Sequence, residues 1–267
     1  MKRKDLFTKL LNDLKNSSLD DMYKYVGTGD PFADILIIGK EAAISKEKQP
    51  EQFKTEIIDN FSAWWKINEK GKFDQSKIQT QTHITYQTPL YPYKGQLLKI
   101  NKGNNNGTSK TWFTYQKLYN RIFDNRENQN IDFHEGVFIT EVNPNPSPKT
   151  KDAEIDIGKL KKRKEIFLSS DFINDFPVII IAGVGYFNTN KNTPDDLNEI
   201  EKTFNVKFHE KMLAGEKARQ PYWIHWNEDK SRLLINTYQL SMLVTDVLFD
   251  EISDLIKTSG LIHLKEN

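Results

Sequence analysis

Polar side chains follow three short apolar runs in this sequence, and they are its strongest candidates for chemistry. Glu41 and Asn236 each come just after such a run, and Glu141 and Asn143 follow a third. A carboxylate that is partly removed from water, as Glu41 would be after a buried strand, can act as a general base near neutral pH. For Glu41 an alternative of equal weight is an acid stabilised by a helix dipole or solvated in a loop. For the asparagines the alternative is turn formation.

Other familiar signals for chemistry are absent from the sequence. The chain has no cysteine, which excludes disulfides and thiolate metal sites. Its five histidines lack the spacing of metal ligands, so we expect no metal site. Neither a Walker A motif, a G-x-G-x-x-G after a strand nor a G-x-S-x-G nucleophile elbow is present, so we expect no cofactor. Gly183-Val184-Gly185 favours a tight turn over a dinucleotide site.

The apolar runs themselves predict strands that are buried on both faces, which is typical of a parallel sheet. Expected strands cover residues 34–38, 136–140, 177–181 and 232–235, and expected helices cover 4–14, 50–66, 111–124, 157–172 and 240–257. Strands that alternate with helices favour an α/β fold with helices on both sides of the sheet. Ligands of open α/β sheets bind beyond the carboxyl ends of the strands, where the polar clusters stand. We expect one domain over residues 1–267, with a long loop insertion at about 67–110.

Charge and hydropathy restrict the possible partners. The chain has 38 basic and 37 acidic residues, a net charge of +1 that does not by itself indicate nucleic acid. The run 159–164 is locally basic, and a solvated helix face is the simpler explanation for it. The sequence lacks both a signal-peptide pattern and a membrane-length apolar stretch, so we expect a cytoplasmic monomer.

The order of these motifs resembles the uracil-DNA glycosylase superfamily, whose fold is a four-stranded, mostly parallel sheet between helices. Gly39-Lys40-Glu41-Ala42 stands where that family has its first motif, directly after the first strand. Asn236-Thr237-Tyr238-Gln239-Leu240-Ser241 stands where the family has His-Pro-Ser and a leucine wedge loop. The likeness runs from about residue 33 to residue 257, in element order and in short motifs.

This resemblance implies a three-layer αβα sandwich and a DNA-repair hydrolase that flips a uracil or other damaged base into a pocket. Glu41 would orient a water toward the sugar C1′, and Asn236 would support the charge on the leaving base. One of three aromatic residues would stack on the base: Tyr86, Tyr91 or Tyr93. The implied substrate contacts are Gly39, Lys40, Glu141, Asn143, Tyr238, Leu240 and Ser241, with Tyr238 or Leu240 as the wedge. The implied phosphate contacts are Lys149, Lys151, Lys161, Lys162, Arg163 and Lys164.

The sequence departs from the family pattern at three positions. Asn236 replaces the histidine that stabilises the leaving base, and losing one such group costs on the order of 10²–10³ in rate. Ala42 replaces the proline, and Glu41 is one methylene longer than the usual aspartate. Two alternatives follow: a catalytically silent member of the same fold that binds nucleic acid or protein, and an unrelated α/β enzyme that acts on a small nucleotide or sugar.

Overall fold

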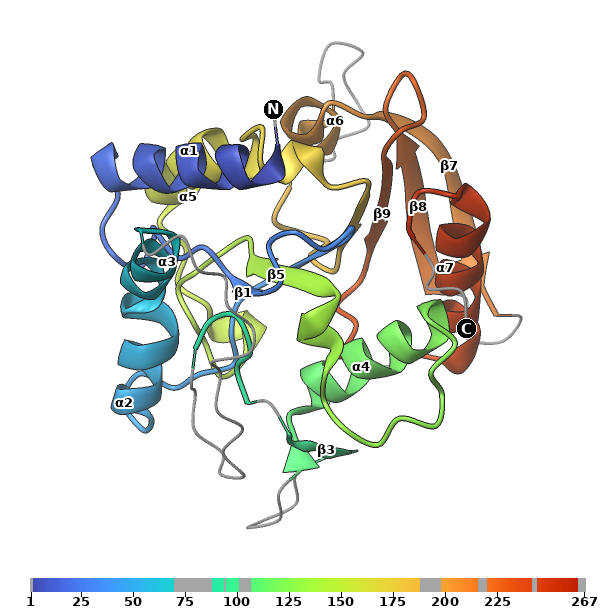
Figure 1. The fold of residues 1–267 in the computed structure, drawn as a ribbon, viewed down its shortest axis with the longest axis horizontal. Helices are drawn as coiled ribbons and strands as arrows, with labels where there is room; N and C mark the ends of the chain where they lie inside the picture. Colours follow the sequence, from blue (N-terminus) through green and yellow to red (C-terminus); the bar gives the residue numbers. More distant parts are fainter. Residues whose placement is uncertain are drawn as a thin grey trace.

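The computed structural model describes residues 2–69, 88–93, 95–100, 107–187, 198–215, 220–241 and 244–263 (Figure 1). In this part of the chain the main sheet has seven strands in the order β1-β5-β2-β6-β9-β8-β7. The strands are β1 (Thr28–Gly29), β2 (Ile35–Gly39), β5 (Val137–Glu141), β6 (Val178–Ile181), β7 (Lys207–Ala214), β8 (Gln220–Trp226) and β9 (Leu233–Thr237). The α-helices and π-helices are α1 (Arg3–Asn16), α2 (Pro50–Phe53), η1 (Lys54–Ile58), α3 (Asn60–Glu69), α4 (Lys110–Ile122), α5 (Ile157–Arg163), η5 (Lys164–Leu168), α6 (Glu199–Phe204) and α7 (Asp246–Ser259), and the 3-10 helices are η3 (Phe133–Glu135), η4 (Thr150–Asp152) and η6 (Ile173–Asp175).

The centre of the sheet consists of the parallel strands β5, β2, β6 and β9, which are the four strands expected from the sequence. The predicted α/β class with a mostly parallel sheet is confirmed, but the predicted number of strands is wrong. β1 pairs antiparallel with β5 at one edge, and β8 and β7 add two antiparallel strands at the other. The sequence pattern did not predict β7 because all but one of its residues are exposed, which removes the apolar alternation of a half-buried strand.

Helices cover both faces of the parallel strands. Successive residues of a strand point to opposite faces, and β2 shows this directly. Leu36 and Ile38 belong to a core formed with Phe7 of α1 and Trp64 of α3. Ile35 and Ile37 belong to a second core, formed with residues of α4 and α7. The whole of β2 is therefore buried, which explains its unbroken apolar sequence.

The expected loop insertion at about 67–110 is described only in part. Residues 70–87, 94 and 101–106 lie outside the described residues, and so does the candidate Tyr86. The described part includes β3 (Leu97–Ile100) and β4 (Gly107–Thr108), which pair in a small separate sheet. This segment leads into α4, where the side chain of Ser109 accepts a hydrogen bond from the backbone N–H of Trp112.

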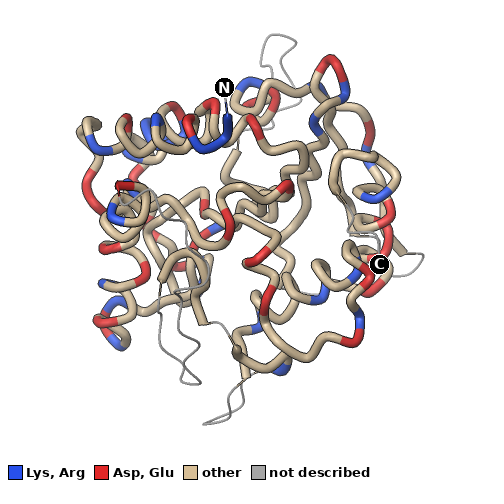
Figure 2. The backbone as a smooth tube through the Cα atoms, in the orientation of Figure 1, with Lys and Arg blue, Asp and Glu red and all other residues tan. Residues whose placement is uncertain are grey.

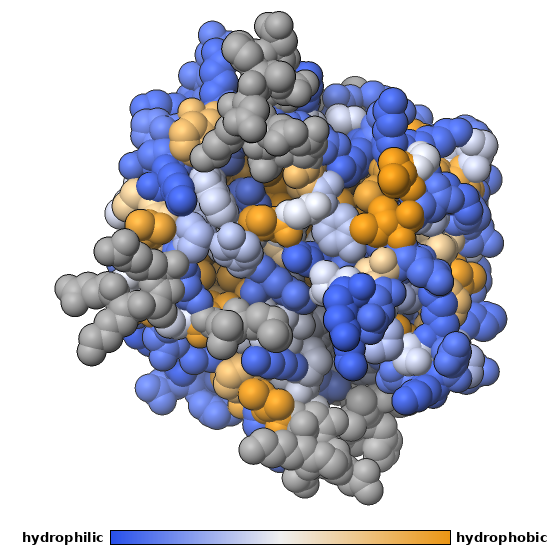
Figure 3. Space-filling view, turned by 180° about the vertical axis from the view of Figure 1, so that it is seen from behind, coloured by the Kyte–Doolittle hydropathy of each residue, from blue (hydrophilic) through white to orange (hydrophobic). Residues whose placement is uncertain are grey.

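The surface is mixed in charge and in hydropathy. Figure 2 shows acidic and basic residues interspersed along the backbone. The face opposite that of Figure 1 is largely hydrophilic, with small separate hydrophobic areas (Figure 3). Within the described ranges, no helix has the length and apolar character needed to cross a membrane.

Candidate active site

Two glutamates lie together at the carboxyl ends of neighbouring parallel strands. Glu141 is the last residue of β5, and Glu41 follows the end of β2. The register pairs Gly39 with Glu141. A Cβ atom placed on Gly39 would lie 2.2 Å from the Glu141 carboxylate oxygen Oε2. Glycine at position 39 therefore leaves the space that the Glu141 carboxylate occupies, and Gly39 also lines the cavity described below.

Tyr186 connects three of these strand ends. It follows β6, and its hydroxyl donates a hydrogen bond of 2.5 Å to Oε2 of Glu41. The amide of Asn143 donates to the same hydroxyl at 3.4 Å and to the carbonyl of Glu154 at 3.2 Å. The structure thus brings Glu41, Glu141 and Asn143 to one edge of the sheet, as the strand order suggested. Tyr186, which the sequence did not single out, holds Glu41 in place.

The two glutamates differ in their electrostatic surroundings. Burial raises the pKa of Glu141 to about 8, and the negative charge of Glu41 adds to this effect. The guanidinium of Arg163 acts in the opposite direction. Oε2 of Glu141 is buried and has no hydrogen-bond partner among the described residues. Glu141 is therefore mainly protonated at pH 7 and can donate a proton.

Arg163 lies behind this pair and is fully buried. Its guanidinium donates hydrogen bonds to the carbonyl of Tyr23 at 3.0 Å, of Tyr25 at 2.6 Å and of Glu141 at 3.1 Å. Burial lowers the pKa of Arg163 to about 9. The predicted phosphate contact is wrong for this residue, because its side chain is fully buried and its Nη1 and Nη2 groups donate to backbone carbonyls inside the protein. Arg163 instead fixes the end of β5.

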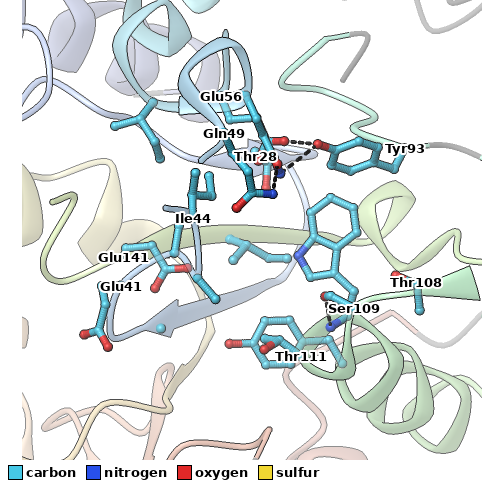
Figure 4. Close-up of a pocket in the computed structure, with 18 of the residues that line it drawn as sticks. Thr28, Glu41, Ile44, Gln49, Glu56, Tyr93, Thr108, Ser109, Thr111 and Glu141 are labelled. Atoms are coloured by element: carbon cyan, nitrogen blue, oxygen red, sulfur yellow. Dashed lines mark hydrogen bonds between the residues drawn. The ribbon is translucent and has the colours of Figure 1, made fainter. Parts of the chain in front are cut away.

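A cavity of about 670 Å³ opens beside the glutamates (Figure 4). Glu41 and Glu141 lie on one side of it, and Trp112 and Tyr115 of α4 are also among its lining residues. Tyr93 closes a further side, with its ring centroid 5.0 Å from that of Trp112. The cavity therefore combines carboxyl groups with an aromatic wall. Its other lining residues include Thr28, Gly39, Lys40, Ile44, Gln49, Glu51, Gln52, Glu56, Thr108, Ser109, Thr111 and Gln239.

The end of the cavity away from Glu41 carries a chain of polar side chains. Gln49 donates to Gln52 at 2.7 Å, and Gln52 donates to the hydroxyl of Tyr93 at 3.2 Å. That hydroxyl donates in turn to Glu56. Burial raises the pKa of Glu56 to about 7. The sequence did not single out Glu56, because it lies within an amphipathic helical pattern that reads as packing.

The aromatic candidates differ in position. Tyr93 lines the cavity, whereas Tyr91 is 3% exposed and lies in the core of the α1 side. Trp112 also lines the cavity, although its helical spacing gave no sign that it does more than pack.

Within the last predicted motif, residues 236–241, which the structure describes in full, the cavity is lined by Gln239 alone. Asn236 is buried on β9 outside the cavity, and its Oδ1 has no partner in the described part of the chain. Leu240 is fully buried in the core with α4 and α7, so the predicted wedge is wrong for this residue. Tyr238 is exposed and packs on Trp223 at 6.0 Å between ring centroids. Ser241 is buried away from the cavity.

The predicted basic contacts are mostly surface residues. Lys161 and Lys162 are exposed on α5, and Lys149 and Lys151 are exposed in the turn that precedes it. Lys164 is less available, because it forms an ion pair with Glu199 at 2.7 Å and donates to the carbonyl of Tyr186.

No cluster that could hold a metal ion is found among the His, Asp and Glu side chains that the structure describes. Comparison of the chain with family models, curated proteins and solved structures found no match.

Proposed function

We propose that this protein hydrolyses an N-glycosidic bond, holding the base in the cavity against Trp112 and the sugar beside Glu41 and Glu141. The observation that carries this proposal is the pair of carboxyl groups at one edge of the sheet, where the Tyr186 hydroxyl holds Glu41 and burial raises the pKa of Glu141 to about 8. A carboxyl group that keeps its proton beside a second carboxyl group is a means of combining acid and base catalysis.

Each glutamate has a role that its contacts support. Glu41, held by the Tyr186 hydroxyl, takes a proton from a water molecule as the water oxygen bonds to C1′. The bond between C1′ and the base nitrogen breaks, and its electron pair stays with the base. Glu141 transfers its proton to the departing base. The products are the free base and a sugar with a hydroxyl at C1′, and proton exchange with solvent restores both glutamates.

The aromatic wall suits a planar base. Trp112 and Tyr93 present rings to the same cavity as the glutamates, and stacking on such rings holds a base that has left the helical stack. Gln52 and Glu56 lie at the far end, where side-chain amides and carboxyls can bond to the edge of a base. In this proposal Gln52 and Glu56 bind the edge of the base, whereas the implied substrate contact Asn143 is not among the lining residues of the cavity.

A base in DNA is the substrate that the resemblance to uracil-DNA glycosylases favours. The parallel strands β5, β2, β6 and β9 with helices on both faces support the predicted αβα sandwich. In this proposal Lys149, Lys151, Lys161 and Lys162 contact phosphates. The charge on the leaving base is relieved by Glu141, since Asn236 lies outside the cavity.

The experiment measures abasic sites in single- and double-stranded oligonucleotides that contain uracil, hypoxanthine or xanthine, together with release of base from the free nucleosides. Glu41→Gln and Glu141→Gln should each lower the rate by roughly 10²–10⁴. Glu228→Gln, at an exposed position in the turn after β8, is the matched control and should not change it.

Cleavage that persists in both glutamine variants would rule out this assignment of the pair. Absence of cleavage with every substrate would contradict the hydrolase itself. Salt-dependent retention of DNA without cleavage would then favour the silent nucleic-acid-binding alternative.

A further inference from the structure

The cavity is predominantly acidic. Four glutamates line it, namely Glu41, Glu51, Glu56 and Glu141, whereas Lys40 is the one lysine or arginine among its described lining residues. Oε2 of Glu141 is also a buried acceptor that no described residue satisfies. A group that enters the cavity therefore meets an excess of hydrogen-bond acceptors and of potential negative charge.

The aromatic walls favour the same kind of ligand. Trp112 and Tyr93 lie 5.0 Å apart between ring centroids, and Tyr115 adds a third ring to the lining. Aromatic rings carry negative charge on their faces and attract cations there, tryptophan most strongly. A flat cation between these rings and the glutamates gains from both.

We propose that the base held in this cavity is a positively charged heterocycle, such as an N-alkylated purine, rather than neutral uracil. The proposal rests on the proposed function for the position of the base. Neutral uracil brings no charge to balance the carboxylates that can form in the cavity, whereas a cation offers the positive charge that those groups lack. A charged base also leaves as a neutral molecule, so Glu141 would compensate its charge and would not need to supply a proton.

Proton release should accompany the binding of a cation. Burial raises the pKa of Glu141 to about 8 and that of Glu56 to about 7, so the empty cavity holds protons near neutral pH. A cation placed between them lowers both pKa values and displaces protons. The groups that act electrostatically on or with Glu141 are Glu41, Arg163, Tyr115 and Tyr186. Those that contact Glu56 are Gln52 and Tyr93, and Glu51 and Lys40 also line the cavity.

Calorimetry with three nucleosides tests the proposal. The probes are 1-methyladenosine, which is a cation at neutral pH, and the neutral nucleosides adenosine and uridine. We expect 1-methyladenosine to bind at least roughly tenfold more tightly than either neutral probe, as one desolvated charge-assisted contact would provide. Titration in buffers of different ionisation enthalpy should reveal protons released on binding.

Variants assign the effect to the cavity. Glu56→Gln and Trp112→Leu should each reduce the preference for 1-methyladenosine by about tenfold or less, towards equality with adenosine. Glu228→Gln, outside the cavity, should leave the preference unchanged. Circular dichroism checks that each variant is folded.

The outcomes separate this inference from the proposed function. Uridine binding as tightly as 1-methyladenosine, or no binding of any probe, would overturn the inference, even if uracil-containing DNA were cleaved. Tight binding of 1-methyladenosine without cleavage of an oligonucleotide that contains 1-methyladenine would support the inference on the ligand and contradict the hydrolase.

Discussion

Replacing Glu141 by glutamine should make the protein more stable in mildly alkaline solution while it abolishes most activity. Burial and the charge of Glu41 raise the pKa of Glu141 from 4.5 to about 8 in the folded protein. The folded state therefore binds more protons than the unfolded state between these pH values. By linkage, the free energy of unfolding contributed by Glu141 is highest below about pH 4.5 and decreases as the pH rises towards about 8.

The size of the effect follows from the same pKa values. One pKa unit corresponds to about 1.4 kcal/mol, so the interval from 4.5 to about 8 sets an upper bound of about 5 kcal/mol. We expect about 2 kcal/mol, because water that reaches the ionised carboxylate from the cavity relieves part of the cost. Glutamine has nearly the same shape and carries no charge. The free energy of unfolding of the variant therefore lacks this pH-dependent contribution.

Urea unfolding of wild type and Glu141→Gln at about pH 5 and about pH 8 measures the difference. The variant should gain about 2 kcal/mol relative to wild type between the two conditions, since all other titrating groups cancel in the comparison. Glu228→Gln, at an exposed carboxylate, should show almost no change. If the free energies of unfolding of Glu141→Gln and wild type differ by the same amount at both pH values, the account of a buried, protonated Glu141 is refuted.

Three further substitutions test the surroundings of the pair. Tyr186→Phe removes the hydrogen bond to Glu41 and should lower the hydrolysis rate by roughly tenfold or more at a stability cost of about 1 kcal/mol, measured by kinetics and urea unfolding. Gly39→Ala should displace the Glu141 carboxylate and lower activity with a small change in melting temperature; full activity would contradict the close approach. Arg163→Met should cost about 3 kcal/mol in urea unfolding, because the backbone carbonyls that the guanidinium satisfies would be buried without donors; an unchanged midpoint would argue against that network.

Some residues of the site could be predicted from the sequence, and others could not. Glu41 and Glu141 were recognisable because both follow unbroken apolar runs, and parallel strands bring such positions to one edge. The sequence around Tyr186 and Glu56 has no comparable pattern that would indicate a functional residue. Tyr186 follows a strand too, but its reach to Glu41 depends on the path of the turn after β6.

The segment after β9 shows the opposite error. Motif likeness predicted that Asn236 and Leu240 face the substrate, yet Asn236 is buried outside the cavity and Leu240 is in the core. Similarity of short motifs predicts only the order of residues along the chain. The direction of each side chain depends on the local backbone and on the residues that pack against it.

The sequence by itself determined the parallel strands, the helices that cover them and the edge at which polar groups gather. These features follow from apolar periodicity, which is a local property of the chain. Only the tertiary structure decided that Glu141 lies over Gly39, that Arg163 is buried, and that Trp112 faces the cavity and not only the core. Each depends on contacts between segments far apart in the chain, and burial, which sets the pKa of Glu141, exists only once those segments have packed.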